Sequence, residues 1–143
     1  MIQFDVSIQI DRPLEQVFAY VADENNMARW NSAVQSVRQT SPEPTGVGAT
    51  YHMVRQLPQG RAENTYKITA YQPNQELTIE TTSGPTPFRY HYRFEPTGNG
   101  TQLSLAAEVK TSGLASLAAP LLTRGIKSGI ETNFATLKQL LEA

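Results

Sequence analysis

The chain of 143 residues contains no cysteine, two histidines and one tryptophan. Without cysteine, disulfide bonds, thiolate catalysis and cysteine-based zinc sites are excluded. The two histidines have no ligand-like spacing to other donors, and no glycine-rich phosphate loop leads from a strand into a helix. No serine stands in the sequence context of a nucleophile. The sequence therefore predicts a protein without a metal site and without a cofactor.

Charge is also scarce. Charged residues make up 17% of the chain, they are scattered, and the formal net charge is -1. Nucleic acid is therefore disfavoured as a partner, as is a polybasic membrane anchor. The first residues lack a basic segment before an apolar run, and no stretch is long and apolar enough for stable membrane insertion. We expect one cytoplasmic domain spanning residues 1–143, and the sequence leaves open whether it forms a homodimer.

A strand with one apolar face is the clearest local pattern. Four aromatic residues alternate with charged or histidine residues, and after a turn at residues 97–100 the alternation continues with aliphatic residues. The apolar positions are Phe88, Tyr90, Tyr92, Phe94, Leu103, Leu105, Ala107 and Val109. This period of two predicts an antiparallel hairpin that buries one face.

The last thirty or so residues change to a helical period. Apolar residues recur at steps of three and four, namely Leu114, Ala118, Leu122, Ile126, Ile130, Phe134, Leu137 and Leu141. A sheet with one apolar face must bury that face, and only this helix is long enough to cover it. We predict that it covers at least residues 125–140, and that a concave space lies between helix and sheet. Its basic residues 124, 127 and 138 would suit a membrane surface, but acidic neighbours favour an ordinary solvated face.

The remaining elements complete an α+β fold. Ile2 to Ile10 alternates as a first strand, Pro13 suits the start of a short helix, and Asp23 to Asn26 forms a break with capping residues before a second short helix. The chain re-enters the sheet near Ala33. Further strands are expected at about Ala49 to Leu57, Arg61 to Tyr71, Glu76 to Ser83 and Phe88 to Glu95. The result is a seven-stranded antiparallel sheet wrapped around the C-terminal helix.

Pro120 allows two arrangements of that helix, because proline in a helix interior removes a hydrogen bond. Either the helix begins near Ala118, or it is kinked at Pro120. We favour a kink or a short preceding turn.

The order of these elements and several short motifs together resemble the START-like superfamily. The motifs are Arg12-Pro13-Leu14-Glu15-Gln16-Val17-Phe18 leading to Asp23, then Trp30-Asn31, Gly46-Val47-Gly48, Tyr71-Gln72-Pro73 and Gly100-Thr101. More narrowly, the chain is similar to the polyketide cyclase/dehydrase and lipid-transport group, whose fold is called a helix grip. The resemblance spans essentially the whole chain. It implies an internal cavity for apolar small molecules, and it implies a cavity more firmly than a reaction, because the group includes enzymes and binding proteins.

The cavity wall should carry the inward-facing aromatic residues and one polar group at its end. The residues predicted to bind the ligand are Trp30, Tyr51, Met53, Arg55, Asn64, Tyr66, Ile68, Phe88, Tyr90, Tyr92, Leu122 and Ile126. Tyrosines give a mostly apolar surface with hydroxyls that fix polar groups of a ligand. The alternative is that they only fill the core. Trp30 either lines the mouth or, as we favour, wedges a helix against the sheet.

Arg55 is the sharpest functional candidate. Tyr51, Met53, Arg55 and Leu57 share one face of their strand, while His52 lies on the other. Facing inward, Arg55 would need an anionic or carbonyl partner, since an unpaired buried charge is costly. Near the strand end it could instead extend its stem and reach water. The sequence leaves both arrangements open.

No carboxylate is confidently placed inside. Residues Glu63, Glu80, Glu95 and Glu108 all fall opposite the apolar positions of their strands, and His91 falls on the same polar face. The favoured function is therefore binding of a hydrophobic small molecule such as a lipid, an aromatic polyketide-like compound or an isoprenoid. The alternative is a cyclase or dehydratase-like enzyme in which Arg55 or a tyrosine hydroxyl polarises a carbonyl or donates a proton. A third candidate is a domain that binds a protein through its exposed sheet face.

Overall fold

A computed structural model of the chain describes residues 1–42, 44–58, 60–110 and 119–143. Its strands form one antiparallel seven-stranded sheet in the order β1-β7-β6-β5-β4-β3-β2. The strands are β1 Ile2–Ile10, β2 Val34–Gln39, β3 Thr50–Leu57, β4 Gly60–Gln72, β5 Glu76–Ser83, β6 Phe88–Thr97 and β7 Gly100–Val109. The predicted sheet is confirmed.

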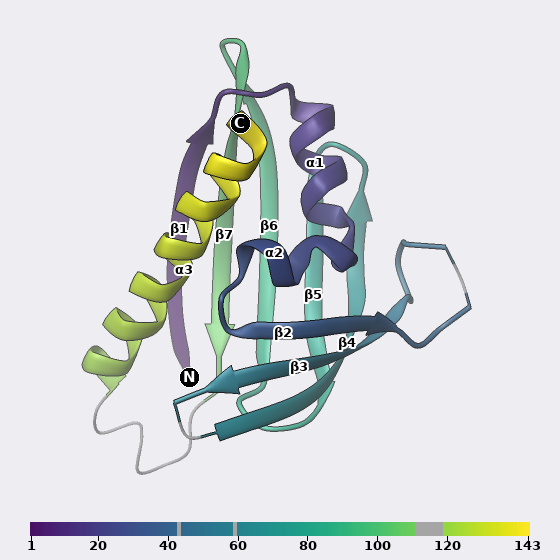
Figure 1. Cartoon of the computed structure of the whole chain (residues 1–143), viewed down its shortest axis with the longest axis vertical. Helices are drawn as coiled ribbons and strands as arrows, with labels where there is room; N and C mark the ends of the chain where they lie inside the picture. Colours follow the sequence, from purple (N-terminus) through teal and green to yellow (C-terminus); the bar gives the residue numbers. More distant parts are fainter. Residues whose placement is uncertain (43, 59, 111–118) are drawn as a thin grey trace.

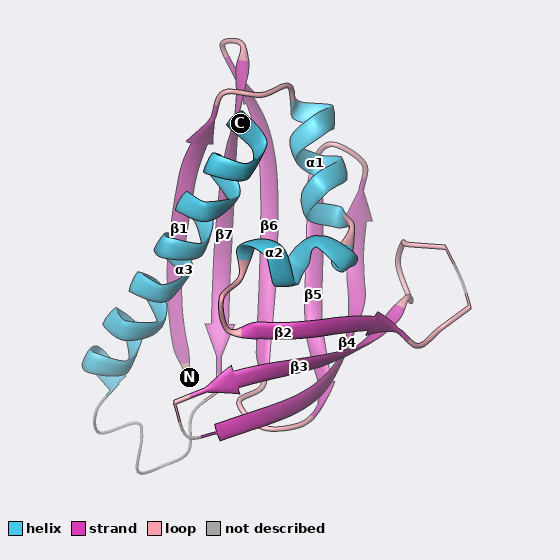
Figure 2. Cartoon of the chain, in the orientation of Figure 1, coloured by secondary structure: helices cyan, strands magenta, loops and turns pink. Residues whose placement is uncertain are grey.

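Two short helices and one long helix cover the concave face (Figure 1). They are α1 Leu14–Ala22, the 3-10 turn η1 Glu24–Asn26 that runs directly into α2 Met27–Trp30, and α3 Ala119–Glu142. Figure 2 shows α1 and α3 in front of the long strands, while β2 and β3 run crosswise below α1 and α2. This is the predicted helix-grip arrangement. Within the described residues, no helix combines the length and the apolar character needed to cross a membrane.

Pro120 is the second described residue of α3. The choice between a helix that begins near Ala118 and a kink at Pro120 depends on the preceding residues, which lie outside the described residues. Leu114 and Ala118 of the predicted apolar stripe lie outside the described residues.

The two halves of α3 pack differently. Phe134, Leu137 and Leu141 are buried in the core, as the helical period predicts. Ile126 and Ile130, nearer the start of the helix, are only half-buried against the same core. The C-terminal half of α3 thus packs into the core, while the N-terminal half is less buried and leaves space between helix and sheet.

Polar contacts also fix the C-terminal end of α3 to β1 and to the two residues that follow that strand. Lys138 Nζ donates to the Gln9 carbonyl at 2.7 Å. The Glu142 carboxylate accepts from the Asp11 backbone N–H at 2.8 Å, and this contact holds the pKa of Glu142 below its usual range. Arg12 Nη2 donates to the Glu142 carbonyl at 2.8 Å. These contacts hold one end of the helix while the other end borders the cavity.

Candidate functional site

Two adjoining chambers lie between the sheet and the helices. The inner chamber, about 30 Å³, is lined by Met27, Asn31, Val34, Met53, Arg55, Ile79, Phe88, Tyr90 and Tyr92. The outer chamber, about 160 Å³, is lined by Asn31, Arg55, Leu57, Thr86, Phe88, Tyr90, Val109, Ile126, Gly129, Ile130 and Asn133. Four residues border both chambers, so the two chambers adjoin and are treated together as one site.

Arg55 lies at the junction of the chambers. The side chain faces inward from β3, and the residue is only 8% exposed, which settles the alternative left open by the sequence. Nη2 donates to Asn64 Oδ1 at 2.7 Å and to the Pro85 carbonyl at 3.1 Å, while Nε has no hydrogen-bond partner among the described residues. Burial lowers the pKa of Arg55. No carboxylate of the described residues lies within 4.0 Å of the guanidinium, so it is a buried cation without a counter-ion.

The turn after β5 supplies the carbonyl partners of Arg55. Gly84 has φ +100°, and a Cβ there would collide with the Glu63 carbonyl and with Asn64, so only glycine fits. Asn64 fixes the same turn, because its Nδ2 donates to the Ser83 and Pro85 carbonyls at 3.2 and 2.8 Å. Arg55 is therefore held through Nη2, while its Nε is left without a hydrogen-bond partner among the described residues.

Aromatic side chains of β6 form one wall of the chambers. Tyr90 stacks on Phe88 with ring centroids 4.4 Å apart, and the Arg55 guanidinium lies 5.3 Å from the Phe88 centroid. Burial raises the pKa of Tyr90, and nearby Arg55 opposes that rise. Burial, Tyr90 and Glu24 raise the pKa of Tyr92 well above its usual value. The wall thus runs from a cationic end at Arg55 toward an acidic residue beyond Tyr92.

That acidic residue, Glu24, was missed by the sequence analysis. It is 3% exposed, its Oε2 accepts a hydrogen bond from the Tyr66 hydroxyl at 3.0 Å, and its Oε1 has no partner among the described residues. Burial is the main reason that the pKa of Glu24 is raised to about 8. The hydrogen bond from Tyr66 lowers this pKa, and the charge of Asp23 raises it by a smaller amount. Glu24 is therefore mostly neutral at pH 7. It is a buried carboxyl of the core that the sequence analysis did not expect, and it is not among the residues that line either chamber.

The sequence carried only a faint signal for this residue. Asp23 caps η1 as predicted, accepting from the Asn25 backbone N–H at 3.1 Å. A glutamate directly after a capping aspartate is ordinarily a solvated first-turn residue. Its burial depends on Tyr66, which is 42 residues away in the sequence.

A polar link joins α3 to the loop after α2. Asn133, 7% exposed, accepts from the Ser32 backbone N–H at 3.1 Å and donates to Asn31 Oδ1 at 3.1 Å. Asn31 and Asn133 both line the outer chamber. The link therefore fixes the position of α3 along that chamber.

The predicted ligand-binding residues divide into two groups. Six line the chambers: Met53, Arg55, Phe88, Tyr90, Tyr92 and Ile126. The others lie in or against the core: Trp30, Tyr51, Asn64, Tyr66, Ile68 and Leu122. Trp30 is buried in the core and packs near Phe134 of α3, with ring centroids 6.3 Å apart, so this contact joins two helices. The sequence missed Met27, Asn31 and Asn133 because short helices and polar residues gave no sign of which side would face the sheet.

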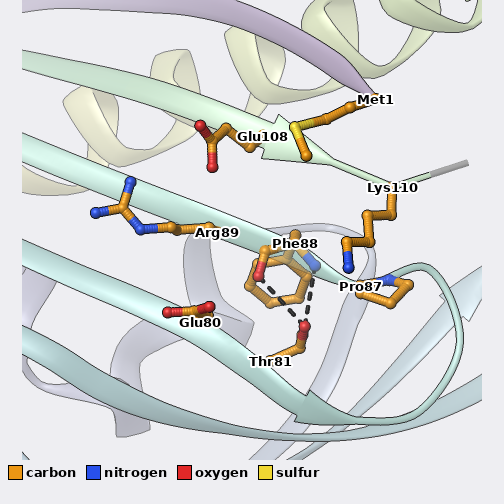
Figure 3. Close-up of a pocket in the computed structure, with 8 residues that line it drawn as sticks. All are labelled: Met1, Glu80, Thr81, Pro87, Phe88, Arg89, Glu108 and Lys110. Carbon is orange, nitrogen blue, oxygen red and sulfur yellow. Dashed lines mark hydrogen bonds between the residues drawn. The ribbon is translucent and has the colours of Figure 1, made fainter.

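The outer surface of the sheet has separate hollows of a different character. One, about 200 Å³, is shown in Figure 3, where Glu80, Arg89 and Glu108 form a cross-strand row of charges beside Met1 and Lys110. Another, about 330 Å³, includes His91 among polar residues of β1, β6 and β7. His91 Nδ1 lies 2.5 Å from Thr78 Oγ1, on the outer side as predicted. These open, solvated hollows lack the buried and unpartnered polar atoms of the interior.

Within the described part of the chain, histidine, aspartate and glutamate side chains nowhere gather in threes as a metal-binding group would. The polar groups of the interior are instead a cation, a neutral acid and several phenols. Such a set can bind and orient the oxygen atoms of an apolar molecule.

Solved structures share this fold at low sequence identity. TTHA0849 from Thermus thermophilus is 15% identical with a TM-score of 0.83, over 97% of this chain and 96% of that one. A START superfamily protein from Mycobacterium smegmatis is 13% identical with a TM-score of 0.78, over 98% and 97%. The di-domain ARO/CYC StfQ of the steffimycin biosynthetic pathway is 17% identical with a TM-score of 0.78, over 99% of this chain and 50% of that one.

None of the curated proteins compared with the chain matches it. A family profile, described as polyketide cyclase/dehydrase and lipid transport, matches residues 1–142. The chain therefore belongs to the polyketide cyclase/dehydrase and lipid transport family, in which a cavity for a hydrophobic ligand is the implied common feature.

Proposed function

We propose that the chain binds a hydrophobic small molecule, such as a lipid, an aromatic polyketide-like compound or an isoprenoid, in the two chambers. The observation that carries this proposal is Arg55, a buried cation without a carboxylate partner among the described residues, beside aromatic side chains. An uncompensated buried charge is costly, and a ligand with an anionic or strongly polarised oxygen would compensate it. The ligand then has an apolar body and a polar head.

Binding assays with matched acids and alcohols test this proposal. We expect decanoic acid and 2-naphthoic acid to bind with one-to-one stoichiometry by calorimetry, more tightly than 1-decanol and 2-naphthalenemethanol. A charge-assisted hydrogen bond of about 1.5 to 3 kcal/mol corresponds to a preference of roughly 10- to 150-fold. Burial of apolar surface should also give a negative heat-capacity change.

Two arginine variants test whether Arg55 causes the preference for acids over alcohols. Arg55→Met keeps much of the packing of the stem and removes the charge, so the preference for acids should disappear while the alcohols bind nearly as before. Arg61→Met is the matched control, because Arg61 is exposed on the neighbouring strand. If the two variants lose the acid preference equally, or if no acid binds the parent protein, the proposal fails.

A cyclase or dehydratase-like reaction is the second candidate function, and Glu24 is the observation that favours it. A neutral carboxyl and a fixed cation in one interior are the groups that could donate a proton and stabilise an enolate oxygen. The assay is loss of water from the β-hydroxy ketone 4-hydroxy-4-phenyl-2-butanone, followed by the absorbance of the conjugated product. Turnover that falls in both Arg55→Met and Glu24→Gln supports an enzyme. A rate equal to the uncatalysed one in the parent protein supports binding alone.

Location in the cytoplasm remains a separate prediction, and whether the chain forms a homodimer is a separate question. Light scattering coupled to size-exclusion chromatography distinguishes monomer from dimer. Fractionation of the host cell tests the location.

A further inference from the structure

The inner end of the site adjoins a second polar group, Glu24, which lies apart from Arg55. The helical run of η1 and α2 places Glu24, Met27 and Asn31 on one side, because the Met27 backbone N–H bonds to the Glu24 carbonyl and the Asn31 N–H to the Met27 carbonyl. Met27 and Asn31 line the inner chamber. Glu24 is therefore the next residue of the same face, directly beyond the narrow end of that chamber.

The strands that face this helical run place their residues in a matching order along the site. On β3 and β4, Tyr51 pairs with Tyr66 and Met53 with Asn64, so the tyrosines lie one step beyond Met53. Tyr66 meets Glu24 through its hydroxyl, and its ring stacks on Tyr51 with centroids 5.2 Å apart. The chambers thus have a cationic group at Arg55, and the polar pair of Glu24 and Tyr66 lies in the core beyond Met53.

Glu24 does not line the inner chamber, but Met27, three residues further along the same helical run, and Met53 do. Met27 and Met53 are both buried and both line the chamber. Methionine is unbranched and has several rotatable bonds, so it can change its shape at low cost. A ligand that displaced these side chains would extend the inner chamber, which is about 30 Å³, toward Glu24.

The carboxyl of Glu24 is poorly suited to a purely structural role. Its Oε1 is buried and has no partner among the described residues, and leaving such an atom unpaired costs free energy that a leucine at this position would not cost. A neutral carboxyl can both donate and accept a hydrogen bond. It is thus able to bind a hydroxyl or a carbonyl oxygen.

We propose, building on the function proposed above, that the ligand carries two oxygen functions: an acidic or enolic one at Arg55, and a hydroxyl or carbonyl at its inner end, which Glu24 binds. The ligand class is a compact, bifunctional aromatic or alicyclic molecule. A simple fatty acid has only the first of these groups.

Three naphthalene acids test the proposal at pH 6, where Glu24 is neutral. 2-Naphthoic acid carries only the carboxylate, 6-hydroxy-2-naphthoic acid adds a hydroxyl at the far end, and 3-hydroxy-2-naphthoic acid adds one beside the carboxylate. We expect the 6-hydroxy acid to bind the parent protein about tenfold more tightly than 2-naphthoic acid, the gain of one hydrogen bond. The 3-hydroxy acid should show no gain that depends on Glu24.

Variants separate this proposal from the function on which it rests. Glu24→Leu should abolish the gain from the 6-hydroxyl, Glu24→Gln should retain part of it, and Arg55→Met should weaken all three acids while the gain remains. Circular dichroism and thermal unfolding confirm that each variant is folded. If the acids bind through Arg55 but the 6-hydroxyl gives no gain, or gives the same gain in Glu24→Leu, this proposal is overturned and the proposed function stands. If none of the acids binds the parent protein, the proposed function fails as well.

Discussion

The buried carboxyl of Glu24 should make the protein less stable as the pH rises. Its pKa is about 8 in the folded chain, against an ordinary value of 4.5. Between these values the folded state holds a proton that the unfolded state has released, so the free energy of unfolding falls with increasing pH. The slope is about 1.4 kcal/mol per pH unit, which amounts to about 5 kcal/mol over the whole window.

Glu24→Gln removes this dependence. Glutamine keeps the size of the side chain and an oxygen that accepts from the Tyr66 hydroxyl, but it does not titrate. Between pH 5 and pH 7 the free energy of unfolding of the parent protein should fall by about 3 kcal/mol through this group. The variant should not show this fall. Tyr51, Tyr66 and Tyr92 stay neutral throughout this window because burial raises their pKa values.

Urea unfolding at pH 5, 6, 7 and 8, followed by the fluorescence of Trp30, measures the difference. Glu131→Gln serves as the control, since Glu131 is exposed on α3 and should give a curve parallel to that of the parent. If the curves of Glu24→Gln and the parent are also parallel, Glu24 is ionised and solvated in the folded state. The argument for a neutral acid at the inner end of the site would then be refuted.

Three further substitutions test the frame of the site. Phe134→Ala removes a fully buried ring from the helix-sheet contact and should cost about 3 to 5 kcal/mol in denaturant unfolding; a loss below about 1 kcal/mol would mean that α3 faces another way. Gly84→Ala should cost about 1 to 3 kcal/mol or more and weaken binding of 2-naphthoic acid, whereas Gly98→Ala, also at positive φ but with open space around it, should leave the affinity unchanged. Asn133→Ala breaks the link between α3 and the loop after α2, so thermal unfolding should show a loss of about 1 to 3 kcal/mol, and an unchanged midpoint would contradict that role.

The period of the apolar residues was enough to predict the architecture. Alternation from Phe88 to Val109 gave the central hairpin, and the steps of three and four around Phe134 gave the covering helix. Both periods are local consequences of backbone geometry, so they can be recognised without knowing what the chain packs against. The inward side of Tyr90 and Tyr92 followed from the same alternation.

Only the tertiary structure decided the chemistry of the interior. The strand with Arg55 alternates ambiguously, and its direction is settled by Asn64 and by the turn after Gly84, which together hold the guanidinium inside. Glu24 looked like an ordinary residue of a capped turn, and it became a buried neutral acid because η1 packs against Tyr66 on a strand far away in the sequence. Local pattern determines which face of an element is apolar. The pKa and the partners of a polar side chain depend on burial by segments that are distant in the sequence, and no local pattern records that burial.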